Sequence, residues 1–240
     1  MTPQAEIDRQ AVIEAEALLA ALTEFSQRAG HDLLGPLSQA GSLLALFLKR
    51  HKDQTGADGN ELLEFLQSAS ARMEGLVVGV RKYMEVAGRR SHPEPVDLNA
   101  SLAGARVSLA APISGSAATI LVDTLPVVMA NPVQMTAMFE ILIGNAIKFR
   151  RPEAAPDIRI SARPEGEWTA IAVEDNGIGI EPESCDAVFL PFKRLNGREY
   201  PGQGLGLATA KLIAAMYGDG IRVDRSAAGG TRVEFRIRAA

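Results

Sequence analysis

The chain contains a single cysteine, Cys185, among its 240 residues. One cysteine cannot form a disulfide framework, and it cannot supply the set of thiolates that a structural zinc site needs. Positive charge is not in excess either, since the formal net charge is -4, whereas a protein that binds nucleic acid usually presents a basic face. We therefore expect neither a disulfide-stabilised fold nor a nucleic-acid partner.

Long hydrophobic runs are also missing. No apolar stretch approaches the roughly 20 residues that an α-helix needs to cross a bilayer, so we expect no membrane span in this chain. The first residues include the acidic side chains Glu6, Asp8 and Glu14, a pattern unlike that of a secretory signal peptide. These absences predict a cytoplasmic protein.

Two prolines and a cluster of charges over residues 89–95 interrupt the periodic pattern and divide the chain. We predict a helical domain over residues 1–90, a linker over 91–96 and a second domain over 97–240. In the helical part, apolar residues recur at alternating spacings of four and three, which is typical of helix-on-helix packing. One such seam comprises Leu62, Leu66, Ala69, Met73, Leu76, Val80, Tyr83 and Ala87.

The preceding helix carries two apolar seams, and turn-forming residues over 51–60 predict the loop between the two helices. The two seams comprise Leu22, Ala29, Leu33, Ala40, Leu43 and Phe47, and Leu34, Leu37, Leu44 and Leu48. A hairpin of two helices cannot bury such wide apolar faces alone. A four-helix bundle built from two chains would bury them, so we expect a homodimer.

His31 lies between these seams, on a stripe of small and polar residues that includes Gly35 and Ser38. A lone histidine on a helix is more often structural than catalytic, but small neighbours leave this imidazole accessible. Asp32 follows directly, and a carboxylate can hold one ring nitrogen protonated while the other is free to attack. Pro36 removes a backbone donor and should bend the helix just after the histidine. We therefore predict that His31 is reactive and that Asp32 orients it.

The other two histidines have no comparable setting. His51 stands at the end of the first helix, where a partial positive charge suits the helix dipole. His92 lies in the proline-containing linker, where we expect it to be solvated. Neither has a second metal ligand at a useful spacing, so we predict no role in chemistry for either.

The second part of the chain alternates helix and strand signals. Asn131 and Pro132 open a helix, with proline in the favoured first turn, and Gly218 ends another. The expected elements are this first helix, a second helix over 205–216, and strands over 158–162, 168–173, 221–223 and 233–237. Their sum is a mixed sheet covered on one face by helices, an α/β sandwich.

The first of two glycine-rich turns begins where a predicted strand ends, at Asp175. A buried carboxylate there could accept a hydrogen bond from an exocyclic amine such as that of adenine, and it would reject bases that lack the donor. Gly177 and Gly179 remove side chains where a ligand must approach the backbone. A Gly-x-Gly turn alone is weak evidence, because most such turns bind nothing.

The second glycine-rich turn runs directly into a helix. A helix start offers free backbone amides and the positive end of a dipole to phosphates, and this turn contains Gly202, Gly204 and Gly206. Asn145 and Lys148 lie one turn apart on another helix. They would supply a neutral oxygen for Mg²⁺ and a cation for phosphate. A bound nucleotide would explain both turns and this pair.

These motifs, in this order, resemble the catalytic core of sensor histidine kinases, nearest to the soluble phytochrome-like branch, over nearly the whole chain. The matching segments are His31–Leu37 for the phosphoacceptor box, Gly144–Phe149 for the asparagine box, Glu174–Ile180 for the first glycine box, Phe189–Arg194 for the phenylalanine box and Gly202–Leu207 for the second glycine box. The resemblance implies a helical hairpin that forms a dimeric four-helix bundle, followed by an α/β sandwich of the Bergerat type that binds ATP and Mg²⁺.

The resemblance also implies roles for single residues. His31 would accept a phosphoryl group beside Asp32, Asn145 would bind Mg²⁺, and Asp175 would read adenine. The remaining residues of the ATP site would then be Lys148 and Arg194 at the phosphates, Phe149 against the base, Thr231 at the pocket floor, and Gly177, Gly179, Gly202, Gly204, Leu205 and Gly206 in the turns.

The chain departs from the family pattern at two positions. The family usually has a second polar residue one helical turn before the box asparagine, and here that residue is Ile141. Nucleotide binding should survive this loss better than catalysis does, because transition-state stabilisation depends on where charge is placed. Many relatives carry a polar residue that supports phosphatase activity where this chain has Gly35, so we do not predict phosphatase activity.

Two functions follow from the resemblance. The first is an ATP-dependent histidine kinase that phosphorylates His31 and passes the phosphoryl group to an aspartate of a response regulator receiver domain docked on the helical hairpin. A separate or upstream sensor module would feed it. The second is a phosphotransfer scaffold that works between receivers without ATP, which the intact glycine boxes disfavour. An ATPase of the chaperone or mismatch-repair type is disfavoured by the phosphoacceptor box.

Overall fold

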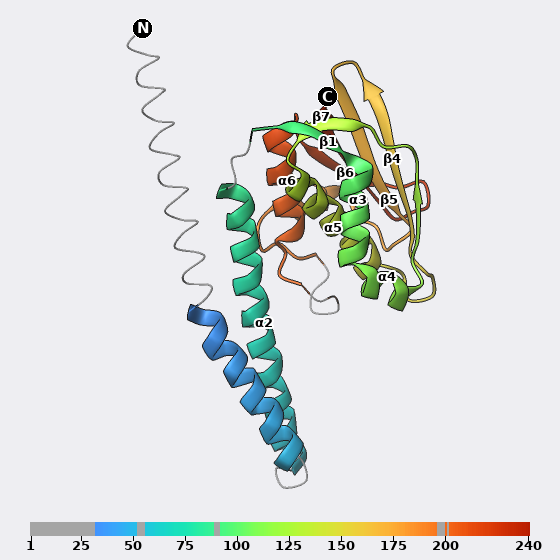
Figure 1. The fold of residues 1–240 in the computed structure, drawn as a ribbon. Coiled ribbons are helices and arrows are strands. Elements are labelled where there is room, and N and C mark those ends of the chain that lie inside the picture. The colour runs from blue at the N-terminus through green and yellow to red at the C-terminus, as the bar shows by residue number, and fades with distance from the viewer. Residues whose placement is uncertain (1–31, 52–55, 89–91, 196–199, 201) are drawn as a thin grey trace, which may run out of the picture. The chain divides into compact units, whose positions relative to one another are not determined.

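A computed structural model describes residues 32–51, 56–88, 92–195, 200 and 202–240. The chain divides into two compact units, Met1–Arg89 and Arg90–Ala240. Each unit is described by itself below (Figure 1). His31, together with Leu22 and Ala29 of the predicted seam, lies outside the described residues.

The first unit contains a helix over residues 32–51 and α2 (Gly56–Gly88), which lie side by side (Figure 1). The helix continues through Pro36. The Ser70 hydroxyl of α2 donates a hydrogen bond of 3.1 Å to the Leu37 carbonyl, and the same hydroxyl lies 3.4 Å from where a Cβ on Gly41 would be. The absent side chain at Gly41 thus lets the two helices approach closely.

The predicted loop over residues 51–60 is too long. Residue 51 is still helical, and α2 begins at Gly56, so residues 56–60 belong to the helix. Asp58 lies in the first turn of α2, where a carboxylate interacts favourably with the positive end of the helix dipole. Turn-forming residues at a helix start therefore look like loop residues in the sequence. His51, at the helix end as predicted, has its ring centroid 4.7 Å from that of Phe47, and His92 is exposed.

The second unit is an α/β sandwich, as predicted. Its five-stranded sheet has the order β2-β4-β5-β7-β6, with β2 parallel to β4 and the other pairs antiparallel. The strands are β2 (Thr119–Val122), β4 (Asp157–Glu165), β5 (Trp168–Asp175), β6 (Ile221–Arg225) and β7 (Thr231–Arg238). The helices α3 (Leu98–Ser108), α5 (Pro132–Lys148) and α6 (Gly206–Tyr217) cover one face, and α4 (Ala110–Ser116) follows α3 (Figure 1).

The start of α5 forms where the sequence predicts it. The Asn131 side chain accepts a hydrogen bond of 3.1 Å from the Gln134 backbone N–H, and Pro132 takes the first helical position. Such a cap satisfies one of the free amides at a helix start. The helix then provides much of the core, since several of its side chains have no exposed surface: Met135, Met138, Phe139 and Ile143.

Several short elements were not predicted. β1 (Glu94–Asp97) overlaps the end of the predicted linker and pairs antiparallel with β3 (Val127–Ala130). Each of these strands has four residues, which is too few for an alternating pattern to stand out. The α3–α4 region escaped prediction as well, because its small residues form no strong apolar periodicity. Two short 3₁₀ turns, Pro182–Ser184 and Ala187–Phe189, follow β5.

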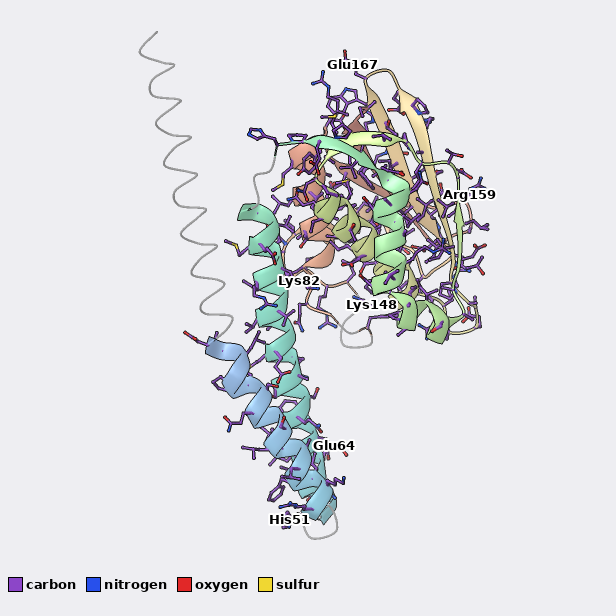
Figure 2. The ribbon with its side chains drawn as sticks, viewed as in Figure 1. His51, Glu64, Lys82, Lys148, Arg159 and Glu167 are labelled. Carbon is purple, nitrogen blue, oxygen red and sulfur yellow. The ribbon has the colours of Figure 1, made fainter. Side chains whose placement is uncertain are left out.

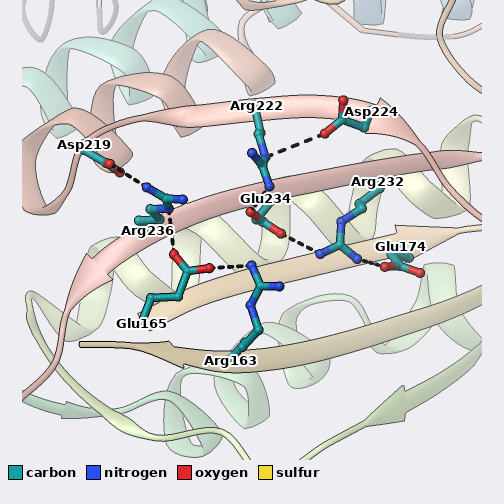
Figure 3. Close-up of polar contacts among 9 residues, drawn as sticks. All are labelled: Arg163, Glu165, Glu174, Asp219, Arg222, Asp224, Arg232, Glu234 and Arg236. Carbon is teal, nitrogen blue, oxygen red and sulfur yellow. Dashed lines mark hydrogen bonds and ion pairs between the residues drawn. The ribbon is translucent and has the colours of Figure 1, made fainter. Parts of the chain in front are cut away.

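Successive residues of β7 point in turn toward the helices and toward the opposite face of the sheet. Val233, Phe235 and Ile237 are buried in the core, while the intervening charged residues form ion pairs on the other face (Figure 3). One chain of pairs runs through Glu174, Arg232, Glu234, Arg222 and Asp224, and a second runs through Arg163, Glu165, Arg236 and Asp219. The pairs that join different strands, Glu174–Arg232, Arg222–Glu234 and Glu165–Arg236, connect β4, β5, β6 and β7.

Glu234 is the centre of the first chain of pairs. Its side chain is 3% exposed and interacts with both Arg222 and Arg232. Burial acts to raise the pKa of Glu234, but the hydrogen bond from Arg232 and the charges of Arg222 and Arg232 hold that pKa below its ordinary value of 4.5. By contrast, Arg159 and Glu167 lie at the surface (Figure 2), and their pairs with Asp123 and Arg238 are exposed.

We predict that Glu234→Gln lowers the free energy of unfolding by about 1–3 kcal/mol at pH 7, because two arginines lose a nearly buried partner. The control Asp123→Asn breaks an exposed pair and should cost less than about 1 kcal/mol. Since the folded-state pKa of Glu234 lies below the unfolded value, its stabilisation is present above pH 4.5 and disappears as pH falls through the folded-state pKa. Denaturant titrations from pH 7 to pH 3 should show the Gln variant's deficit shrinking. A deficit independent of pH would contradict this account.

Candidate functional site

The Asp175 carboxylate stands at the corner where β5 ends and β7 begins. Its Oδ1 accepts hydrogen bonds from the Gly177 backbone N–H at 2.8 Å and from the Thr231 backbone N–H at 2.9 Å. Among the described residues, both bonds go to Oδ1, and Oδ2 accepts none. The side chain is therefore fixed by one oxygen, and the other keeps its capacity to accept a hydrogen bond.

Burial governs the charge of this carboxylate. It raises the pKa of Asp175 above its ordinary value of 3.8, although the N–H groups of Thr231 and Gly177 and the charge of Arg151 act in the opposite direction. The Arg151 guanidinium also donates a hydrogen bond of 3.2 Å to the Gly229 carbonyl. A cation thus lies beside the carboxylate and is attached to the turn that precedes β7.

Glycine is required at this corner because neighbouring backbone atoms approach too closely to leave room for a side chain. A Cβ on Gly177 would lie 2.5 Å from the Phe149 carbonyl oxygen, and a Cβ on Gly230 would lie 2.3 Å from the Asp175 carbonyl oxygen. Gly179 has a φ of +79° and its Cβ would lie 3.2 Å from the Gly229 carbonyl oxygen. Any larger residue at 177 or 230 would displace the backbone around the carboxylate.

The first glycine turn is also attached to the end of α5. The Ile178 backbone N–H donates a hydrogen bond of 3.0 Å to the Phe149 carbonyl, one of the carbonyl groups that a helix end leaves without a partner. This bond brings Phe149, and the preceding Lys148, close to Asp175. The asparagine and first glycine boxes therefore meet in space.

Lys148 and Phe149 contact residues of the loop that follows β5. The Lys148 Nζ lies 4.1 Å from the centroid of the Phe149 ring and 2.9 Å from where a Cβ on Gly202 would be. The Tyr200 ring packs on Phe149 with centroids 5.1 Å apart, and Arg194 donates a hydrogen bond of 2.7 Å to the Tyr200 carbonyl. Burial, and then the charge of Arg194, lower the pKa of Lys148. Two cations and two aromatic rings thus gather beside the glycine turns.

The second glycine turn places the start of α6 against α5. A Cβ on Gly206, the first residue of α6, would lie 3.4 Å from Ile141 Cγ2 and 3.9 Å from Asn145 Nδ2. Gly204 has a φ of +72°, and its Cβ would lie 2.6 Å from the Lys193 carbonyl oxygen. Its own carbonyl accepts a hydrogen bond of 2.9 Å from Phe192, a non-glycine residue with a φ of 64°. The phenylalanine and second glycine boxes are therefore interlocked.

The structure brings together most of the residues predicted for the ATP site. Asp175, Gly177 and Thr231 share one set of hydrogen bonds, and Asn145 lies near Gly206. Lys148 lies near Gly202, and Leu205 is buried directly before α6. Asp32 belongs to the first unit and is described separately from these residues, and His31 lies outside the described residues.

Four residues of this region were missing from the sequence analysis: Arg151, Tyr200, Ser226 and Gly230. Gly230 directly precedes Thr231, and its backbone lies against Asp175. Ser226 is buried, and its hydroxyl also contacts the Asp175 backbone. No local pattern marks Arg151, Tyr200 or Ser226, because each acts through a partner at least six residues away.

Comparison with known proteins assigns the second unit to a family. Residues 130–240 match the family of histidine kinase-, DNA gyrase B-, and HSP90-like ATPases. Over 98% of its length the chain is 37% identical to cyanobacterial phytochrome A of Nostoc sp. and 32% identical to the phytochrome-like protein Cph1 of Synechocystis sp.. It spans 31% of the length of each of these relatives.

Solved structures confirm the fold. Full-length ShkA in complex with AMPPNP is 20% identical, with a TM-score of 0.64 over 90% of this chain and 46% of that one. The histidine kinase AdeS of Acinetobacter baumannii is 19% identical, with a TM-score of 0.58 over 85% of this chain and 96% of that one. These matches include both the helical region and the α/β sandwich.

Two observations bear on the predicted absences. Within the described ranges no helix is long and apolar enough to cross a membrane. In the same ranges no three His, Cys, Asp or Glu side chains form a group that could hold a metal ion.

The order of the boxes, their arrangement around Asp175 and the matches along the whole chain agree with one another. Residues 130–240 belong to the family of histidine kinase-, DNA gyrase B-, and HSP90-like ATPases, and nearly the whole chain is similar to sensor histidine kinases of the phytochrome type.

Proposed function

We propose that this chain is an ATP-dependent protein histidine kinase of a two-component system. It transfers the γ-phosphoryl group of Mg-ATP to His31 and then to an aspartate of a response regulator receiver domain. The observation that carries this proposal is the Asp175 carboxylate, which two backbone N–H groups hold by Oδ1 while Oδ2 is available to the exocyclic amine of adenine. Phe149, whose backbone carbonyl accepts a hydrogen bond from Ile178 at this corner and whose ring packs on Tyr200, would contact the base.

The phosphates would lie between the end of α5 and the start of α6. Lys148 and Arg194 provide positive charge there, and the start of α6 would offer its first backbone amides to the phosphates. Asn145, close to Gly206, offers a neutral oxygen to Mg²⁺. Since Mg²⁺ keeps several waters and phosphate oxygens as ligands, one protein oxygen fits its usual coordination in nucleotide sites.

The helical unit would form a homodimer. Within the described part of this unit, many large apolar side chains are exposed in the single chain: Leu33, Leu43, Leu46, Phe47, Leu62, Phe65, Leu66, Met73 and Leu76. A second copy would cover them in a four-helix bundle. Light scattering should then give twice the mass of one 25.5 kDa chain, and a monomeric mass would contradict the dimer.

A phosphotransfer scaffold that does not use ATP is the second candidate. It is favoured by Ile141, an apolar side chain that lies beside Gly206 and one turn from Asn145, where the family usually has a polar group. We rank it below the kinase because the hydrogen bonds of Asp175 and the close packing of the glycine turns beside Lys148 support a nucleotide site. A location in the cytoplasm and a separate sensor module remain predictions.

Incubation of the chain with Mg²⁺ and γ-labelled ATP tests the proposed activity. We expect acid-labile, alkali-stable label on the protein, absent from His31→Gln and retained in the matched variants His51→Gln and His92→Gln. Addition of a cognate receiver domain should move the label to the receiver, but not to a variant that lacks its acceptor aspartate. No label on a protein that binds ATP would favour the scaffold, and equal label in His31→Gln would exclude His31 as the acceptor.

Ile141→Asn tests the departure from the family pattern. The new amide would lie one turn from Asn145, beside the start of α6, and could help to neutralise the transferring phosphate. We expect the initial rate of His31 labelling to rise about tenfold, with the dissociation constant for ADP changing less than about threefold because ground-state binding does not need this group. Ile141→Val is the matched control. An unchanged labelling rate in Ile141→Asn would show that the position does not limit catalysis.

A further inference from the structure

Ser226 follows the last residue of β6 and is 7% exposed. Its hydroxyl donates a hydrogen bond of 2.6 Å to the Asp175 carbonyl oxygen and accepts one of 2.9 Å from the Gly230 backbone N–H. Its own backbone N–H donates to the Gly230 carbonyl at 3.0 Å. One side chain thus links the end of β5 to the turn between β6 and β7.

Both partners of this hydroxyl adjoin the groups that hold the Asp175 carboxylate. The first partner is the carbonyl of Asp175 itself. The second is the N–H of Gly230, the residue directly before Thr231, whose N–H donates to Oδ1. Because Gly230 has no Cβ, its backbone can approach the Asp175 oxygens closely. The hydroxyl therefore fixes the distance between the carboxylate and one of its two donors.

We propose that Ser226 is a positioning residue for recognition of the nucleobase. By holding the backbone of Asp175 against the turn before Thr231, it directs Oδ2 toward the 6-amino group of a purine. It thereby determines the preference for a 6-amino over a 6-oxo purine. This inference rests on the proposed function, since it assigns a support to the carboxylate that would read adenine.

The long-range bond distinguishes this role from simple closure of a turn. A serine that only closed the turn between β6 and β7 would need no bond outside residues 226–230. The Ser226 hydroxyl reaches 51 positions along the chain to the Asp175 carbonyl. Loss of the hydroxyl would leave that carbonyl and the Gly230 N–H, both close to the carboxylate, without this partner.

Isothermal titration of Ser226→Ala with ADP and with inosine diphosphate tests the role. These ligands share their phosphates and ribose, but adenine has a 6-amino group and an N1 acceptor, whereas hypoxanthine has a 6-oxo group and an N1–H donor. We expect the variant's affinity for ADP to fall about tenfold and its affinity for inosine diphosphate to change less than about twofold. The reason is that only ADP has a 6-amino group to donate to Asp175 Oδ2. Ser226→Thr, which keeps the hydroxyl, should restore the preference for ADP.

Ser101→Ala is the matched control, because Ser101 is a buried serine of the same unit whose hydroxyl donates to the backbone carbonyl of Asp97, the N-cap of α3. It should leave both affinities unchanged. Thermal unfolding monitored by circular dichroism identifies a folded Ser226→Ala protein. If that variant does not fold, Ser226→Cys, with a weaker donor of similar size, takes its place in the same titrations.

The outcomes separate this inference from the proposed function. An unmodified chain that binds ADP, together with a Ser226→Ala variant of unchanged preference, would overturn the role of Ser226 alone. Equal losses for both diphosphates would also overturn it, since they indicate a general loss of the pocket. An unmodified chain without affinity for ADP would overturn the proposed function and this inference together.

Discussion

The hydrogen bonds to Asp175 Oδ1 join three parts of the second unit at one point. The Thr231 N–H brings the start of β7 to the carboxylate, and the Gly177 N–H brings the first glycine turn. The same turn donates through Ile178 to the Phe149 carbonyl at the end of α5. A carboxylate that is mostly buried costs desolvation energy unless such donors compensate it. Burial nevertheless raises the pKa of Asp175, so a ligand that supplied a further donor would stabilise the charged carboxylate.

Contacts elsewhere in the second unit hold the strands and helices around this corner in place. On one face of the sheet, the ion pair between Glu174 and Arg232 joins the two residues that adjoin Asp175 and Thr231 (Figure 3). On the other face, the buried Tyr217 hydroxyl donates to the Gln134 side chain and ties the end of α6 to the start of α5. At the opposite ends of these two helices, the start of α6 with its glycine turn is thereby held next to the end of α5. Packing, ion pairs and site geometry depend on the same strand register.

Long periodic elements and the boxes themselves could be predicted from the sequence. The cap at Asn131 and the strand that ends at Asp175 follow local rules, and the glycine turns are visible because their residues are adjacent. The four-residue strands β1 and β3 were missed, since each exists only through its partner. Ser226, Arg151 and Tyr200 were missed for a similar reason: their contacts depend on how distant segments meet. The start of α2 at Gly56 was missed because glycine and aspartate favour both loops and helix starts.

The central claim is that the Asp175 carboxylate recognises the adenine amine, and Asp175→Asn tests it most directly. The substitution keeps an oxygen that can accept the bonds from Gly177 and Thr231, and it replaces the ligand-facing acceptor by an NH₂ donor. Isothermal titration with ADP should detect no binding by a variant whose thermal unfolding remains cooperative. Undiminished affinity for ADP in a folded Asp175→Asn protein would contradict the account.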